Sequence, residues 1–242
     1  NNLSKVNWIK EGDDYIWLSR STYSIALIVE IRKKLFQKGK VSIFVPDYFC
    51  NSSLALIRKK NINIYFYNLN DKLEPEKNSL NELLKRVTPD IIIQVHYFGN
   101  SSDTNYLRKV CNENLAWLVE DATHVMVPFG DIGKTGDFVL YSPYKHFHIP
   151  EGALLVFHQN RFRYMFSINK LLSDVELSID SIQKINKSIF ILNWFLKRFI
   201  QSFFNPSRLT KQAVDSNFNQ KLITTGARLS HISLRLLQLS IY

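Results

Sequence analysis

The sequence of 242 residues has only two cysteines, Cys50 and Cys111. Two thiols in a chain of this size do not form a disulfide framework, so we expect a protein of the reducing cytoplasm. The first residues lack the hydrophobic segment of a signal peptide, which favours the same location. They also lack a Met, so we expect the natural protein to begin upstream.

Long hydrophobic runs are also missing. The most apolar segment, residues 189–204, is interrupted by Lys197 and Arg198. The longest uncharged stretch there, residues 188–196, is much shorter than the ~20 residues that a membrane-spanning helix needs. We interpret the segment as a helix that packs on a domain or on a second subunit, in preference to one that lies on a membrane surface.

Long basic runs are missing as well. The net charge of +10 comes from 31 Lys and Arg residues that are spread along the chain, with no basic block longer than residues 58–60. This patterning argues against nucleic-acid binding. A solvated lysine-rich surface accounts for most of the charge, and a basic cleft for a phosphate-containing ligand is compatible with the rest.

The pattern of apolar residues predicts one large α/β domain, because the chain is 45% apolar and long enough for a sizeable core. Several apolar runs are continuous, as in strands that are covered on both faces. We expect strands at 41–45, 62–67, 91–95, 115–119, 138–141 and 153–157, and helices between them at 52–60, 80–86 and 104–114. Ser79 and Glu82 have the spacing of a capping box. The alternation predicts a mostly parallel sheet flanked by helices.

The pattern changes to helices after residue 157. We expect them at 161–172, 175–204 and 208–242. The domain therefore has two expected parts, a strand and helix part of about residues 15–160 and a helical part of about residues 161–242.

Polar residues follow several of the predicted strands, at the sheet edge where function lies in parallel α/β proteins. Asp121 closes the run 115–120, and Lys145 follows the run 138–141, 24 residues after Asp121. Such a pair meets the needs of pyridoxal phosphate (PLP), whose aldehyde a lysine binds as a Schiff base and whose ring nitrogen a carboxylate keeps protonated. Spacing alone leaves two simpler interpretations open, Asp121 as a helix N-cap and Lys145 as a surface lysine.

The segments around this pair resemble a known family. They are VPDY at 45–48, VHYFG at 95–99, EDATH at 120–124, GDF at 136–138, SPYK at 142–145, PEGA at 150–153 and GARLS at 226–230. In this order they resemble the DegT/DnrJ/EryC1/StrS family of sugar aminotransferases, of the aspartate-aminotransferase (fold type I) superfamily. The resemblance implies the PLP-transferase fold type I large domain. The family's smaller C-terminal domain is absent or truncated here, and a fragment and a natural truncation both remain open.

The resemblance implies roles for the residues near the cofactor ring. Lys145 is the lysine that binds the cofactor and moves the proton, Asp121 is the partner of the ring nitrogen, and His124 approaches the ring. Tyr48 or Phe49 is expected to cover the ring, because Cys50 stands where the family has an aromatic residue.

The phosphate is assigned to a helix N-terminus near Ser21, where free amides favour an anion. Arg20, Ser21 and Thr22 occupy the place of the family's S-G-T turn, so Arg20 replaces a glycine and side chains are expected to hold more of the phosphate. Ser142 either contributes to the same site or caps the turn before Pro143.

The substrate side is assigned to His96, Glu151 and Arg228. Arg228 matches the arginine of the family's G-x-N-x-R helix opening, which reaches the active site of the partner subunit. His146 and His148 lack the carboxylate or thiol neighbours of a metal site, so we expect no metal.

The resemblance implies a PLP-dependent aminotransferase, a cytoplasmic homodimer in surface polysaccharide (for example O-antigen) or deoxyaminosugar biosynthesis. It would transfer an amino group from glutamate to a nucleotide-linked keto-sugar. Two alternatives remain. A PLP-dependent sugar dehydratase has a His in place of the lysine, so Lys145 argues against it. A non-catalytic remnant that acts as an assembly subunit is favoured by the missing domain, by Arg20 and by Gly226 in place of Asn.

Overall fold

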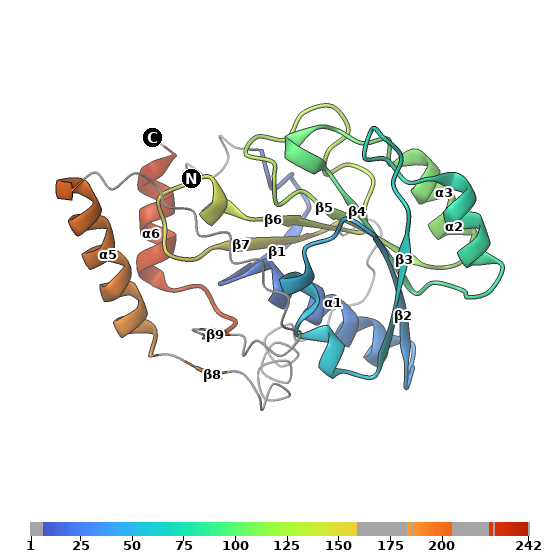
Figure 1. Ribbon diagram of the computed structural model, residues 1–242, viewed down its shortest axis with the longest axis horizontal. Coiled ribbons are helices and arrows are strands. Elements are labelled where there is room, and N and C mark those ends of the chain that lie inside the picture. Colours follow the sequence, from blue (N-terminus) through green and yellow to red (C-terminus); the bar gives the residue numbers. More distant parts are fainter. Residues whose placement is uncertain (1–6, 159–182, 185, 205–222, 225, 242) are drawn as a thin grey trace.

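The computed structural model describes residues 7–158, 183–184, 186–204, 223–224 and 226–241 (Figure 1). Its centre is a seven-stranded sheet with the order β1-β7-β6-β5-β4-β2-β3. The strands are β1 (Asp14–Leu18), β2 (Val41–Pro46), β3 (Ile62–Tyr67), β4 (Ile91–Val95), β5 (Trp117–Asp121), β6 (Phe138–Tyr141) and β7 (Ala153–Phe157). The five strands from β6 to β3 are parallel, and β7 pairs antiparallel with both β6 and β1. The prediction of a mostly parallel sheet is confirmed.

Five of the six predicted strands agree with the structure to within one residue. The exception is β5, which begins at Trp117 because Leu115 has a φ of 54° and Ala116 N–H donates to Cys111 in the turn after a helix. This shift puts Glu120 and Asp121 at the end of the strand, with their side chains on opposite faces. β1 was not predicted, since its residues are partly exposed at the sheet edge.

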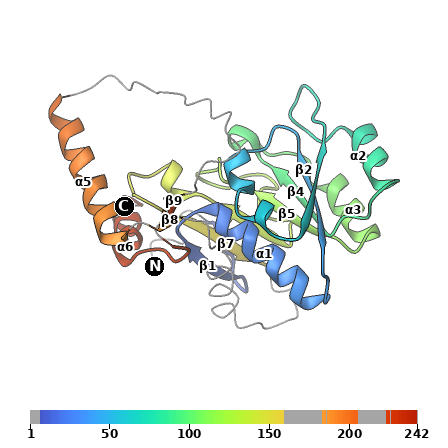
Figure 2. The ribbon, with the colours of Figure 1, turned by 60° about the horizontal axis from the view of Figure 1, so that its bottom comes forward.

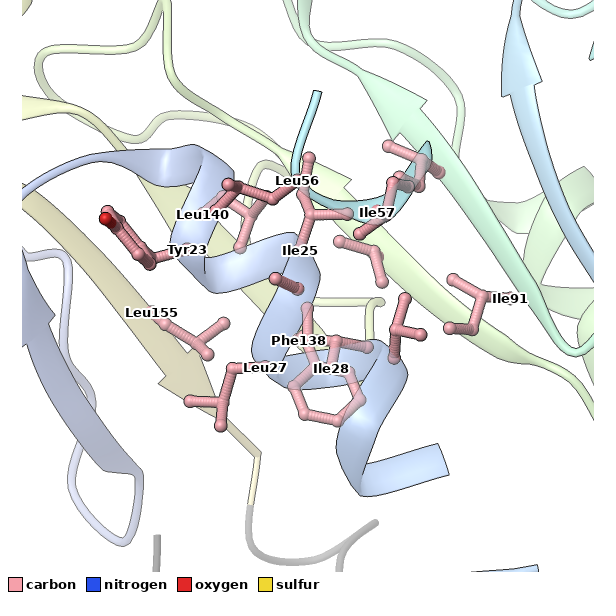
Figure 3. Close-up of a cluster of buried hydrophobic side chains, with 14 of the residues drawn as sticks. Tyr23, Ile25, Leu27, Ile28, Leu56, Ile57, Ile91, Phe138, Leu140 and Leu155 are labelled. Carbon is pink, nitrogen blue, oxygen red and sulfur yellow. The ribbon is translucent and has the colours of Figure 1, made fainter. Parts of the chain in front are cut away.

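One face of the sheet is covered by α1 (Ser21–Leu35), whose side chains are buried from Thr22 to Val29. Figure 3 shows apolar side chains of α1, of the sheet strands and of the segment around residue 56 in one cluster. Its labelled members are Tyr23, Ile25, Leu27, Ile28, Leu56, Ile57, Ile91, Phe138, Leu140 and Leu155. Asp121 shares this face with Val119, because strand side chains alternate.

The opposite face is covered by α2 (Lys77–Leu84) and α3 (Asn105–Glu113), on the right in Figure 1. α3 confirms the helix expected at 104–114. The capping box is wrong, because α2 begins before Ser79 and the Ser79 hydroxyl accepts a hydrogen bond from Asn68 N at 2.9 Å. The helix expected at 52–60 is also wrong. The structure has two short 3-10 turns, η2 (Asn51–Leu54) and η3 (Ile57–Lys59). Leu54 and Leu56 are both buried there, which one face of an α-helix does not allow.

The C-terminal part contains α5 (Lys187–Phe204) and α6 (His231–Ser240), with two short parallel strands, β8 (Gln183–Lys184) and β9 (Ile223–Thr224). Figures 1 and 2 show α6 between α5 and the sheet. The helix expected at 161–172 lies outside the described residues. The continuous helix expected over 208–242 is wrong for the described part, where β9 precedes α6 and Ser230 caps the helix by accepting from Ser233 N. In the described part of the chain, every helix is too short or too polar to cross a membrane.

Candidate active site

Lys145 and Asp121 line the same cavity, which has a volume of about 230 Å³. It lies at the carboxyl ends of parallel strands, because its lining residues follow or end β2, β4, β5 and β6. Three further predicted site residues, Tyr48, Phe49 and His124, line it as well. The remaining lining residues are Cys50, Ser53, Val95, Tyr97 and Thr123. The fold therefore brings together the residues that were assigned to the cofactor ring.

Thr123 connects the two principal side chains of the cavity. Asp121, the last residue of β5, accepts a hydrogen bond from Thr123 N to its Oδ1 at 3.0 Å. Lys145, in the 3-10 turn η5 (Pro143–Lys145) after β6, donates from Nζ to Thr123 Oγ1 at 3.1 Å. The Lys145 amine and the Asp121 carboxylate thus line the same cavity and are linked by their hydrogen bonds to Thr123. They do not form an ion pair with each other.

Glu120 points to the opposite face and belongs to a separate buried network. Its carboxylate accepts hydrogen bonds from Gly133 N at 2.7 Å and Thr135 N at 2.8 Å, and also from Gly136 N. His96 lies 2.8 Å from Glu120 through Nε2. Because Ser102 N donates to His96 Nδ1 at 3.2 Å, Nε2 carries the proton and donates to Glu120. His96 is fully buried in this network and does not line the cavity.

Two histidines near Lys145 are held in the neutral form. Burial lowers the pKa of His124, and the nearby charge of Lys145 lowers it further. The ring of His124 stacks on Phe98 at a centroid distance of 6.0 Å, and its Nδ1 accepts from Phe98 N at 3.4 Å. Burial likewise lowers the pKa of His146, against the effect of a hydrogen bond to the Thr123 backbone. Neutral imidazoles leave the positive charge of this part of the cavity to Lys145.

Aromatic rings line the side of the cavity that follows β2 and β4. Tyr48 and Tyr97 are in contact, with ring centroids 5.7 Å apart, and Tyr97 Oη donates to the Tyr48 carbonyl at 2.7 Å. Burial raises the pKa of Tyr97, as does the charge of Asp121, so its hydroxyl stays protonated as a donor. Tyr48 or Phe49 as the cover of a cofactor ring remains a prediction.

Three residues assigned to the phosphate, Arg20, Ser21 and Thr22, lie at the N-terminus of α1, and neither they nor Ser142 line the cavity. The Arg20 guanidinium lies 4.3 Å from the centroid of the Tyr144 ring and donates to the Pro150 carbonyl at 3.4 Å. Thr22 Oγ1 donates to the Ser53 carbonyl at 3.0 Å. The first turn of α1, which begins at Ser21, contains no acidic residue.

Ser142 provides the test of whether this region fits a phosphate. It follows β6, a strand that α1 contacts, and it is fully buried. Within the described residues its hydroxyl has no hydrogen-bond partner. A buried hydroxyl without a partner costs free energy unless a ligand or water supplies the bond. Such a hydroxyl is a donor that fits an anion such as a phosphate group, as are the free amides at the start of α1.

Glu151 and Arg228 lie away from the cavity. Glu151 is fully buried, accepts from Ser230 N at 2.9 Å through Oε1, and lies 3.9 Å from Lys187 Nζ. It therefore joins the segment after Lys145 to the start of α6. Arg228 pairs through its backbone with Leu18 and lines a second cavity of about 260 Å³ at the start of α6. Their roles toward a substrate remain predictions.

The sequence analysis missed several lining residues, above all Thr123 and Tyr97. A signal for Thr123 was present, because the family segment E-D-A-A-H/Q has Ala where this chain has Thr. Tyr97 lies in the VHYFG segment, in which only His96 was assigned. Alternation along β4 explains the exchange, since Val95 and His96 face opposite sides and the chain turns after His96.

Several solved structures have a similar fold. NtdA from Bacillus subtilis, with bound cofactor PMP, matches with a TM-score of 0.58 at 14% identity, over 94% of this chain and 43% of NtdA. DesI, in the presence of its TDP-sugar product, matches with a TM-score of 0.53 at 18% identity, over 66% of this chain and 41% of DesI. A DegT DnrJ EryC1 StrS aminotransferase from Brucella abortus matches with a TM-score of 0.53 at 15% identity, over 94% of this chain and 54% of that protein. At these identities the similarity shows the fold alone, and it confirms the PLP-transferase fold type I prediction.

The chain spans about two fifths of the length of NtdA and DesI. A search of curated proteins found no match. The profile of the DegT/DnrJ/EryC1/StrS aminotransferase family matches residues 21–170, more than half of the sequence. With the order of segments and the fold in agreement, the chain belongs to the DegT/DnrJ/EryC1/StrS aminotransferase family.

Proposed function

We propose that this chain is the cofactor-binding part of a PLP-dependent aminotransferase. One observation carries the proposal: Lys145 and Asp121 line a single cavity at the carboxyl edge of the sheet, where both contact Thr123. The aminotransferases of the family use PLP, and a lysine with a carboxylate partner is the pair that this cofactor needs. A surface lysine and a simple N-cap do not account for their meeting in one cavity.

The residues of the site would share the work as follows. Bound PLP supplies a ring that withdraws electrons from the reacting carbon. Lys145 Nζ binds the aldehyde and, when it is free, takes up and returns the proton that transamination moves. The Asp121 carboxylate holds the proton on the ring nitrogen. Arg20, Ser21 and Ser142 bind the phosphate at the N-terminus of α1.

We further propose a nucleotide-linked keto-sugar as the amino acceptor and glutamate as the donor. Two structural relatives were solved with nucleotide-linked sugars, DesI with its TDP-sugar product and a GDP-4-keto-6-deoxymannose-3-dehydratase with GDP-perosamine. Lys145 in the cavity favours transamination over dehydration, because the dehydratases of the family have a His in place of that lysine. Surface polysaccharide or deoxyaminosugar synthesis in the cytoplasm is the expected setting, and both cysteines are free thiols.

The test is covalent trapping of the cofactor. We expect purified protein to take up PLP, and borohydride reduction followed by peptide mass spectrometry to place the pyridoxyl group on Lys145. Lys145→Ala should lose the modification. Lys134→Ala is the matched control, because Lys134 is exposed and forms an ion pair with Asp131 at 3.6 Å, outside the cavity. Modification of another lysine would contradict the assignment, and no uptake at all would support a non-catalytic remnant.

We also propose that the protein forms a homodimer through α5. Five large apolar side chains of this helix are between 41% and 66% exposed, namely Ile189, Leu192, Phe195, Leu196 and Phe199. An apolar face of this size on one helix is typical of an interaction surface. Light scattering should show a dimer or larger species, and Leu192→Gln with Phe199→Gln should shift it toward the monomer. A monomeric wild-type protein would contradict the proposal.

A further inference from the structure

Two polar groups of Thr123 form hydrogen bonds, each with a different side chain of the site. Its backbone N–H donates to Asp121 Oδ1 at 3.0 Å, and its Oγ1 accepts from Lys145 Nζ at 3.1 Å. Thr123 itself is only 4% exposed, whereas Lys145 is an exposed residue, so the hydroxyl holds the amine at the edge of the buried region.

We propose that Thr123 is a positioning residue that holds the free amine of Lys145 beside Asp121 and keeps the two charges from pairing directly. This inference rests on the proposed function, because it gives the amine and the carboxylate their tasks. In this role Thr123 does not contact the reacting atoms of a substrate. It acts through Lys145 and Asp121.

The stereochemistry of threonine makes such positioning effective. Branching at Cβ restricts χ1, so the direction of Oγ1 is fixed relative to the backbone. The same backbone is bound to the carboxylate through its N–H, and therefore the amine and the carboxylate are held in one geometry. Lys145 has an exposed and flexible side chain, whose ordering in one rotamer costs conformational entropy.

The hydroxyl also decides which partner the amine has. Within the described residues Lys145 forms no ion pair within 4.0 Å, although Asp121 lines the same cavity. A neutral acceptor orients the amine without adding the attraction that a carboxylate would exert on its proton. A direct Lys145–Asp121 pair would keep the amine protonated and unreactive, and it would occupy the carboxylate that the ring nitrogen needs.

The test compares Thr123→Val, which keeps the shape and removes the hydroxyl, with Thr123→Ser, which keeps the hydroxyl. Thr123→Ala serves as a second variant without the hydroxyl if the Val variant folds poorly. Thr104→Val is the matched control, because Thr104 is buried and does not line the cavity. Its hydroxyl donates to Thr135 Oγ1 at a distance of 2.7 Å. Circular dichroism and thermal melting select the variants that fold.

The first measurement uses the protein without cofactor. Trace labelling with acetic anhydride at a series of pH values, read by mass spectrometry, gives the reactivity of Lys145 relative to Lys134 as an internal standard. We expect Thr123→Val to move the rise in Lys145 reactivity to higher pH, with roughly tenfold less labelling at neutral pH for a shift of one pH unit. Thr123→Ser should restore the wild-type profile.

The second measurement is the rate at which PLP becomes attached to Lys145, trapped by borohydride. It should fall roughly tenfold in Thr123→Val and recover in Thr123→Ser, in proportion to the loss of reactive amine. Wild-type labelling and attachment in Thr123→Val would overturn the inference, as would equal losses in Thr104→Val or no recovery in Thr123→Ser. If the wild-type protein does not attach PLP, the proposed function fails, and the labelling profile still decides the role of Thr123.

Discussion

The two faces of the sheet at the end of β5 hold adjacent carboxylates in opposite conditions. On one face Glu120 accepts hydrogen bonds from His96 and from the loop of residues 133–136, and its side chain is fully buried. On the other face Asp121 borders an open cavity together with Thr123 and Lys145. The hydrogen bonds of the first carboxylate all come from the protein, whereas the second accepts one from Thr123 N and borders a cavity.

Close packing on the Glu120 face makes that side a rigid support. Gly133 has a φ of +70°, and a Cβ there would lie 2.4 Å from Tyr141 Oη. A Cβ on Gly136 would lie 2.7 Å from the Phe138 carbonyl oxygen. Any larger residue would push the loop away from Glu120. With the proposed function, one strand would provide stability through Glu120 and chemistry through Asp121.

The largest expected effect is on turnover, and it should divide the two carboxylates. Asp121→Asn should bind PLP but lose the glutamate half-reaction by about 10⁴-fold, since an amide does not hold a proton on the ring nitrogen, which is roughly 5.5 kcal/mol of barrier. Glu120→Gln should retain the half-reaction in the molecules that fold. Absorbance changes on mixing the PLP-loaded protein with glutamate measure both. Near wild-type turnover in folded Asp121→Asn would contradict the catalytic role and would show that Asp121 is only a helix N-cap.

The next effect is on stability, where the Glu120 substitution should have the larger effect and the Asp121 substitution the smaller one. Glu120→Ala leaves His96 and three backbone N–H groups buried without their acceptor, so it should destabilise the fold by about 3–5 kcal/mol. Asp121→Asn should cost about 1 kcal/mol, because the amide oxygen can still accept from Thr123 N. Urea unfolding followed by circular dichroism provides the comparison. Equal losses in the two variants would show that the faces do not differ in this way.

The faces should also respond to acid in different pH ranges. Burial and the charge of Lys145 lower the pKa of His124, so stability linked to it is complete above the ordinary value of 6.5 and is lost as the pH falls through the lowered pKa. Burial opposes ionisation of Glu120, but hydrogen bonds from His96 and the glycine amides lower its pKa below the ordinary 4.5. Its contribution is therefore lost only below about pH 4.5.

Thermal melting between pH 8 and pH 3.5 checks this separation. His124→Gln should flatten the decrease that begins below pH 6.5, although the similar shift of His146 leaves part of it in place. Glu120→Gln should flatten only the decrease below about pH 4.5. A profile in which His124→Gln changes nothing above pH 5 would contradict the assignment.

The smallest expected effect compares two tyrosine hydroxyls. Tyr97→Phe removes the hydrogen bond to the Tyr48 carbonyl at the cavity, whereas Tyr67→Phe removes a buried one of 2.7 Å to the Ile93 carbonyl. Each should cost about 1 kcal/mol of stability. Only Tyr97→Phe should weaken PLP binding, by a few fold, because it loosens the aromatic lining. Titration of PLP absorbance measures this, and an equal weakening in Tyr67→Phe would remove the distinction.

Local patterns predicted much of the sheet and part of the site. Continuous apolar runs marked five strands to within a residue, because strands buried on both faces have few polar positions. The segment around residues 52–60 was predicted less well. Its conformation depends on the packing of Leu54, Leu56 and Ile57 in the same cluster as α1, and those partners are distant in the sequence. For the same reason the helix expected from residue 208 gave way, in its described part, to β9 and a later start at His231.

The sequence by itself determined that Asp121 and Lys145 end up at one edge of the sheet, because each follows a strand of a parallel pair and such strands point the same way. It also carried the segments that identify the family. Only the tertiary structure decided which face of β4 and β5 opens to the cavity, so that Tyr97 lines it and His96 is buried with Glu120. Alternation along a strand separates neighbouring residues onto two faces but does not say which face is covered, and that depends on where the helices and the loop of residues 133–136 pack.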